Sequence, residues 1–159
     1  MFSKIKMTNY PPQKNPVLVW DGKCGFCKFW VIRLNQHTRG RISFRTYQEA
    51  ADQFRDIPVK EFKKASRLIE LDGRVYSGPD SLYRSLQHSN KKTLPWHYWY
   101  HKFGWFAKLS DHGYNFIAKH RPMMFTLTKL LFGEQPQKIK HYWLLYAIIL
   151  PVLLLFILD

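Results

Sequence analysis

Val17-Leu18-Val19-Trp20-Asp21-Gly22-Lys23-Cys24-Gly25-Phe26-Cys27 joins a short apolar run to the two cysteines of the chain. The apolar residues Val17–Trp20 predict a buried strand, and Asp21-Gly22 predicts a turn directly after it. From Gly25 to about His37 no proline interrupts, and apolar residues cover most of the circumference of a helix. We therefore expect the cysteine pair to lie between a buried strand and the start of a helix that packs on a sheet.

The spacing of Cys24 and Cys27 lets both sulfur atoms meet in one small ring, so a disulfide can form and open without large backbone movement. In a cytoplasmic chain, such a pair at a helix start predicts a redox centre. The helix amino terminus favours a thiolate, which attacks through a mixed disulfide. We expect Cys24 to be the more accessible thiol and the nucleophile, and Cys27 to be the resolving thiol. Lys23 adds positive charge, and Asp21 either accepts or relays a proton or only shapes the turn.

Two other interpretations of the cysteine pair stay open. The pair is either half of a tetrahedral zinc site or two inert core cysteines. A zinc site needs two more ligands, and the chain has no second cysteine pair. We therefore predict a site without metal and without a cofactor. His97 and His101 have helical i, i+4 spacing, but a histidine pair without a carboxylate or cysteine beside it is only a weak indication of metal or haem binding.

The segments up to residue 94 continue the alternation of strands and helices. Ile42–Tyr47 alternates apolar and polar residues, which is typical of a strand. The other expected elements are a helix at Gln48–Phe54, a helical turn at Val59–Lys64, strands at Arg67–Leu71 and Arg74–Ser77 around the hairpin turn Asp72-Gly73, and a helix from Pro79 to about Gln87. The resulting order, β-α-β-α-β-β-α, is that of a thioredoxin-like α/β fold.

The run from Val17 to Cys27 resembles the thiol-disulfide oxidoreductases of the DCC family, which are marked by an apolar strand followed by Asp-Gly-x-Cys-x-x-Cys. The similarity covers roughly residues 16–125. The resemblance implies a thioredoxin-like fold and a redox dithiol, with Asp21, Cys24 and Cys27 as the site residues. Further matching segments are Arg39–Phe44, Asp72–Ser77, Asp80–Leu82 and the closing Tyr114–Arg121.

Two departures from related proteins stand out. Thioredoxins place a cis-proline just before the third strand, where it faces the dithiol, whereas this chain has Lys64-Ala65-Ser66 there. We therefore expect substrate docking to differ from that of thioredoxin. Many DCC relatives also carry a further cysteine near the carboxyl end, and this chain has none.

The chain is strongly basic, with 25 Lys and Arg against 11 Asp and Glu and a formal charge of +14. Such an excess predicts an anionic partner, either nucleic acid or an anionic membrane surface. Residues 1–15 lack the apolar stretch of a secretory signal, so the cysteine domain is expected on the cytoplasmic side. The last segment favours membrane lipids over nucleic acid, because Tyr142–Leu158 carries no charged residue and follows Lys138 and Lys140.

Tyr142–Leu158 therefore predicts a carboxy-terminal transmembrane helix and a single-pass membrane anchor, although a helix docked on a partner is the alternative. The aromatic run at 96–106 either lies at a membrane interface or covers the core. The predicted organisation is an irregular lead-in at 1–15, a thioredoxin-like domain at 16–94, an aromatic and basic helical extension at 95–137 and a transmembrane tail at 138–159.

Two hypotheses about function follow. The first is a membrane-anchored thiol-disulfide oxidoreductase that acts on protein or small-molecule thiols and disulfides. The second is a non-catalytic accessory subunit of a membrane protein complex, in which the thioredoxin-like body serves for docking. A fold alone does not choose between them.

Overall fold

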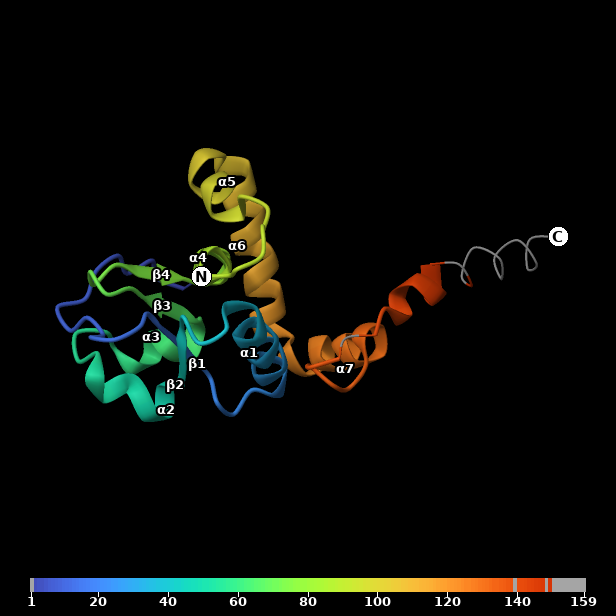
Figure 1. Cartoon of the computed structure of the whole chain (residues 1–159), viewed down its shortest axis with the longest axis horizontal. Coiled ribbons are helices and arrows are strands. Elements are labelled where there is room, and N and C mark those ends of the chain that lie inside the picture. Colours follow the sequence, from blue (N-terminus) through green and yellow to red (C-terminus); the bar gives the residue numbers. More distant parts are fainter. Residues whose placement is uncertain (1, 139, 148, 150–159) are drawn as a thin grey trace.

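The computed structural model describes residues 2–138, 140–147 and 149, and the chain has a mixed α/β fold (Figure 1). The observed order agrees with the predicted alternation of strands and helices, except that the helix expected at Gln48–Phe54 is divided into two short pieces. The elements up to residue 87 are β1 (Val17–Trp20), α1 (Gly25–Thr38), β2 (Ser43–Thr46), α2 (Tyr47–Ala50), the 3-10 turn η1 (Ala51–Gln53), α3 (Val59–Lys64), β3 (Arg67–Ile69), β4 (Val75–Ser77) and α4 (Pro79–Gln87).

The four strands form one sheet in the order β2-β1-β3-β4. β1 pairs in parallel with β2, and the pairs β1–β3 and β3–β4 are antiparallel. Leu18 at the centre of β1 lies opposite Phe44 on one side and Leu68 on the other. The parallel pair is joined through α1, as expected for a crossover connection, and β1 therefore ends beside the start of α1.

Each face of the sheet has its own apolar core, because successive side chains of a strand point to opposite faces. Val17 and Val19 pack with residues of α2, η1 and α3, including the fully buried Phe54 and Phe62. Leu18 points to the opposite face and packs with residues such as Leu34 of α1. Figure 1 shows the resulting layers, with α2 and α3 on one side of the sheet and α1 on the other.

Arg67 of β3 is fully buried and carries the charge that the interior must neutralise. Its Nη2 lies 3.0 Å from Oε2 of Glu61, which is itself buried, and its Nη1 donates to Ser3 O at 3.1 Å and to Ser77 Oγ. Hydrogen bonds from Ser3 and Lys64 lower the pKa of Glu61 to about 2. The network ties the amino-terminal segment to α3 and to the sheet.

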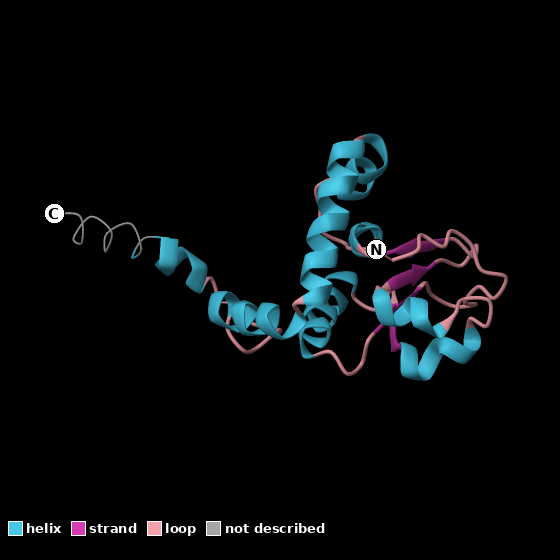
Figure 2. Cartoon of the chain, turned by 180° about the vertical axis from the view of Figure 1, so that it is seen from behind, coloured by secondary structure: helices cyan, strands magenta, loops and turns pink. Residues whose placement is uncertain are grey.

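Three further helices follow the sheet, namely α5 (Trp96–Lys102), α6 (Gly104–Lys119) and α7 (Arg121–Phe132) (Figure 2). Part of the aromatic run at 96–106 packs on α4. The ring of Tyr83 in α4 stacks on Trp96 and on Phe106, with centroids 6.2 and 5.8 Å apart. Tyr100 is buried, and its hydroxyl donates to Asp111 Oδ1 at 2.7 Å. The other side of the run is exposed at Tyr98, Phe103 and Trp105.

The transmembrane part of the predicted fold class is wrong. Within the described part of the chain, no helix has both the length and the apolar character needed to cross a membrane. Residues 142–147 of the predicted span are helical. The rest of the predicted span, at 148 and 150–159, lies outside the described residues.

The predicted localisation, a single-pass anchor with the cysteine domain on the cytoplasmic side, is also wrong, because the described residues contain no membrane-spanning helix. Anionic membrane lipids and a membrane protein complex were expected as partners because of this span. Without the span, these two expected partners are unsupported. The division of the chain into the four segments 1–15, 16–94, 95–137 and 138–159 stays a prediction.

Candidate dithiol site

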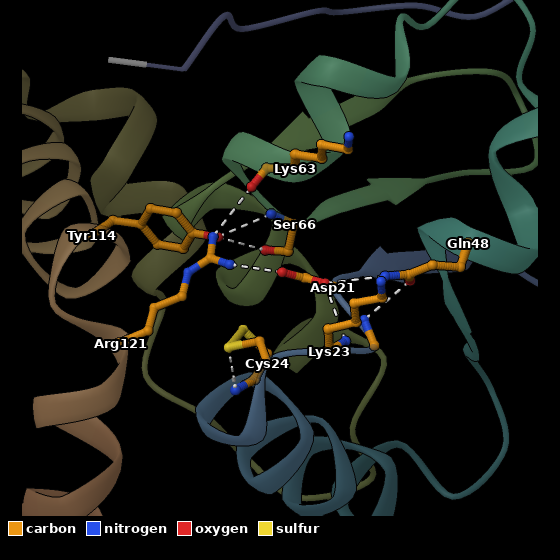
Figure 3. The surroundings of a disulfide bond; sticks show 10 residues. Asp21, Lys23, Cys24, Gln48, Lys63, Ser66, Tyr114 and Arg121 are labelled. Carbon is orange, nitrogen blue, oxygen red and sulfur yellow. Dashed lines mark hydrogen bonds and ion pairs between the residues drawn. A yellow bond between two sulfur atoms is a disulfide. The ribbon is translucent and has the colours of Figure 1, made fainter.

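The turn after β1 is built around the carboxylate of Asp21. Its Oδ1 accepts from Lys23 N at 3.1 Å and from Gln48 Nε2 at 3.2 Å, and its Oδ2 lies 3.0 Å from Nη1 of Arg121 (Figure 3). The backbone carbonyl of Asp21 accepts from Cys24 N at 3.1 Å. Asp21 therefore links the turn to α2 and α7 and sets the position of Cys24, which favours the turn-shaping role that the sequence left open.

Gly22 allows this turn to lie close to the sheet. A Cβ atom on Gly22 would lie 2.6 Å from Cγ2 of Thr46, at the end of β2. Gly22 N also donates to Gln48 Oε1 at 3.2 Å. A larger residue would push the turn, and Cys24 with it, away from the carboxyl ends of β1 and β2.

Cys24 and Cys27 form a disulfide at the amino terminus of α1. Cys24 is the N-cap residue of this helix, and its Sγ accepts from the backbone N–H of Cys27 at 3.1 Å. This hydrogen bond and the dipole of α1 both favour negative charge on the Cys24 sulfur. Within the described residues, no group of three or more potential metal ligands includes either cysteine.

The accessibility expected for the two cysteines is reversed. Cys24 is buried at 9% exposure, whereas Cys27 is partly exposed. α7 packs against the start of α1. The ring of Phe125 lies so close to Gly25 that a Cβ atom there would be 2.9 Å from it. No local feature of the sequence predicts this contact, because Phe125 is far from Gly25 along the chain.

The closing segment Tyr114–Arg121 reaches the site at two points (Figure 3). The hydroxyl of Tyr114 accepts from the backbone N–H of Ser66 at 2.9 Å, just before β3. Arg121 forms the ion pair with Asp21 and also donates to Lys63 O at 3.3 Å. Tyr114 thus binds the backbone just before β3, at the position where a thioredoxin was expected to have its cis-proline. Arg121 connects the α6–α7 junction to the turn after β1.

Two hollows lie beside this arrangement. An open hollow of about 430 Å³ shares Arg121 with the site and is also lined by Lys63, Lys64 and Lys119, so its surface is basic. A second hollow of about 330 Å³ is almost entirely apolar and contains Phe26, from between the two cysteines, together with residues of α4, α6 and α7. Lys23 is exposed next to the disulfide and adds to the positive charge.

A disulfide at a helix start, on an α/β scaffold, defines a dithiol–disulfide redox protein. The family model of the DCC1-like thiol-disulfide oxidoreductases matches residues 18–127, which is more than half of the 159 residues. The chain belongs to this family, and the resemblance found in the sequence is confirmed. Searches of curated proteins and of solved structures gave no significant match.

Proposed function

We propose that the chain catalyses thiol–disulfide exchange through Cys24 and Cys27, with a mixed disulfide as the intermediate. The family assigns a thiol-disulfide oxidoreductase, and thiols or disulfides of proteins or small molecules are the corresponding substrates. The observation that carries the mechanism is the hydrogen bond from Cys27 N–H to Cys24 Sγ at the start of α1. It marks Cys24 as the sulfur whose thiolate the helix stabilises.

The exchange balances in two steps. The thiolate of Cys24 attacks one sulfur of a substrate disulfide, forms the Cys24–substrate disulfide and releases the first substrate thiolate. The thiol of Cys27 then loses its proton to solvent and attacks Cys24 Sγ, which restores the intramolecular disulfide and releases the second thiolate. The substrate disulfide is reduced by two electrons, and the dithiol is oxidised by the same two.

The surrounding residues have positioning and electrostatic roles in this proposal. Asp21 holds the turn that carries Cys24, and Arg121 holds Asp21 in place. Lys23 and the basic hollow with Lys63 and Lys119 make the approach to the site favourable for anionic substrates. Attack on the substrate requires Cys24 to become more exposed than it is in the disulfide form.

Oxidation of the reduced chain by glutathione disulfide tests the proposal. We expect one equivalent of glutathione disulfide to convert the dithiol to the Cys24–Cys27 disulfide and to release two equivalents of glutathione. The neutral 2-hydroxyethyl disulfide is the matched control, and we expect it to react more slowly at low salt, with a smaller difference at high salt. Stopped-flow fluorescence and mass spectrometry follow the reaction. No exchange with either disulfide would instead favour a non-catalytic docking module.

A further inference from the structure

Asp80, His97 and His101 bring three metal-ligating side chains together at the start of α4, in a position separate from the dithiol. Asp80 Oδ1 lies 2.7 Å from His97 Nδ1, and Asp80 Oδ2 lies 3.1 Å from His101 Nε2. One ligand atom from each of the three side chains lies within 4.8 Å of the others. The sequence analysis found only the histidine pair, and the fold places the carboxylate of Asp80 beside it.

Two elements hold this arrangement. Asp80 is the second residue of α4, directly after Pro79, and its side chain is buried, with only 9% exposed. His97 and His101 are one turn apart on α5, so both rings lie on the same helix face. The His97 ring also packs edge-on against Tyr76 of β4, with centroids 5.2 Å apart. The aromatic contacts between α4 and α5 hold the two helices together, so that Asp80 stays close to His97 and His101.

We propose that Asp80, His97 and His101 bind a divalent first-row transition metal ion. Two imidazoles and one carboxylate form the donor set that zinc and its neighbours accept, and three protein ligands leave a position for water or an exogenous ligand. Asp80 and His101 also line a hollow of about 680 Å³, so such a position has access from solvent. The metal would bind neutral imidazoles at His97 Nδ1 and His101 Nε2, with the ring protons on the opposite nitrogens.

The local charges permit a cation here although the chain is basic overall. Three basic side chains line the hollow, namely Lys4, Lys6 and Arg74. Two of them are paired with carboxylates, because Lys4 Nζ lies 2.6 Å from Asp111 and Arg74 lies 2.6 Å from Asp72. A simple ion pair between α4 and α5 would need one histidine only. A second histidine, His101, lies against the other carboxylate oxygen of Asp80. An ion pair alone does not explain this second histidine, whereas a metal site needs it as a ligand.

Titration of the full chain with Co²⁺ and Zn²⁺, with the disulfide intact, tests this proposal. The disulfide form is used because free thiols would bind the same metals. We expect one equivalent of Co²⁺ to give the visible absorption of a four- or five-coordinate ion and Zn²⁺ to displace it. We also expect the metal to raise the melting temperature by mass action.

Three variants make the test specific. His101→Gln, Asp80→Asn and the double variant His97→Gln/His101→Gln each remove ligands, and we expect affinity to fall at least about tenfold in the single variants, because even changes around a ligand cost about 10–100-fold. His112→Gln, at an exposed position of α6, is the matched control and should bind as the wild type does. Circular dichroism checks that each variant is folded. Absence of saturable binding to the wild type, or unchanged binding to the folded double variant, would overturn the proposal.

Discussion

Replacement of Cys24 by serine is expected to slow disulfide exchange by at least about a thousandfold, because a serine hydroxyl is not ionised at neutral pH and cannot form the mixed disulfide. Cys24 and Cys27 are the only cysteines of the chain, so Cys24→Ser leaves a single thiol and no background from other sites. The rate of reaction with glutathione disulfide is measured by release of glutathione.

The matched control is Cys27→Ser, which keeps the Cys24 sulfur at the start of α1. We expect this variant to carry out the first step at a rate within about tenfold of the wild type and then to stop at the mixed disulfide. Equal loss of the first step in both variants would show that the two sulfurs are not divided into attacking and resolving roles. A faster first step in Cys24→Ser than in Cys27→Ser would assign the attack to Cys27, the more exposed of the two.

The largest effect on stability is expected from Arg67→Met. Removal of the guanidinium takes away the buried cation beside Glu61, whose remaining partners are Ser3 and the half-exposed Lys64. Breaking a buried ion pair in this way typically costs about 3–5 kcal/mol. The free energy of unfolding is measured by urea denaturation at pH 7. Arg55→Met, at an exposed position, is the control and should change stability by less than about 0.5 kcal/mol.

Acid should weaken the contribution of Glu61 to the stability of the wild type, as measured by urea denaturation at decreasing pH. The pKa of Glu61 is lowered from 4.5 to about 2 by hydrogen bonds from Ser3 and Lys64. A carboxyl group with a lowered pKa stabilises the fold fully above its unfolded value, and this contribution is lost as the pH falls from 4.5 towards about 2. If Arg67→Met is as stable as the wild type at pH 7, the network is not a source of stability.

The sequence predicted the elements whose signals are local. Val17–Trp20, the turn at Asp21-Gly22 and the start of α1 follow one another without interruption, and Asp72-Gly73 sets the hairpin of β3 and β4. These features depend on the residues that form turns and on the spacing of apolar residues along the chain. Both can be recognised in a single sequence. The position of the cysteine pair at the helix start follows from them directly.

The contacts that complete the site could not be predicted, because they join residues far apart in sequence. Asp21 and Arg121 are separated by 100 positions, and Ser66 and Tyr114 by 48. Arg121 and Tyr114 were indicated only as members of a family segment, without a role. The same limit applies to the burial of Cys24 in the disulfide form, because the packing of distant segments decides it.

The transmembrane prediction failed for a different reason. The uncharged stretch Tyr142–Leu158 was judged on its hydropathy, its length and its flanking residues, and no helix of sufficient length and apolar character is found in the described part of the chain. The histidine pair was limited by a contact between distant residues. His97 and His101 were a weak signal because their carboxylate partner, Asp80, lies 17 positions before His97 and on another helix.

The most direct test of the redox account is mass spectrometry of the Cys27→Ser variant after reaction with glutathione disulfide. We predict a single adduct of one glutathione per chain, located by peptide mapping at Cys24 and removed by dithiothreitol. Formation of this adduct should be faster in the folded variant than in the same variant denatured in urea at the same pH, because the start of α1 favours the thiolate. A folded Cys27→Ser variant that forms no adduct at Cys24 would contradict the account.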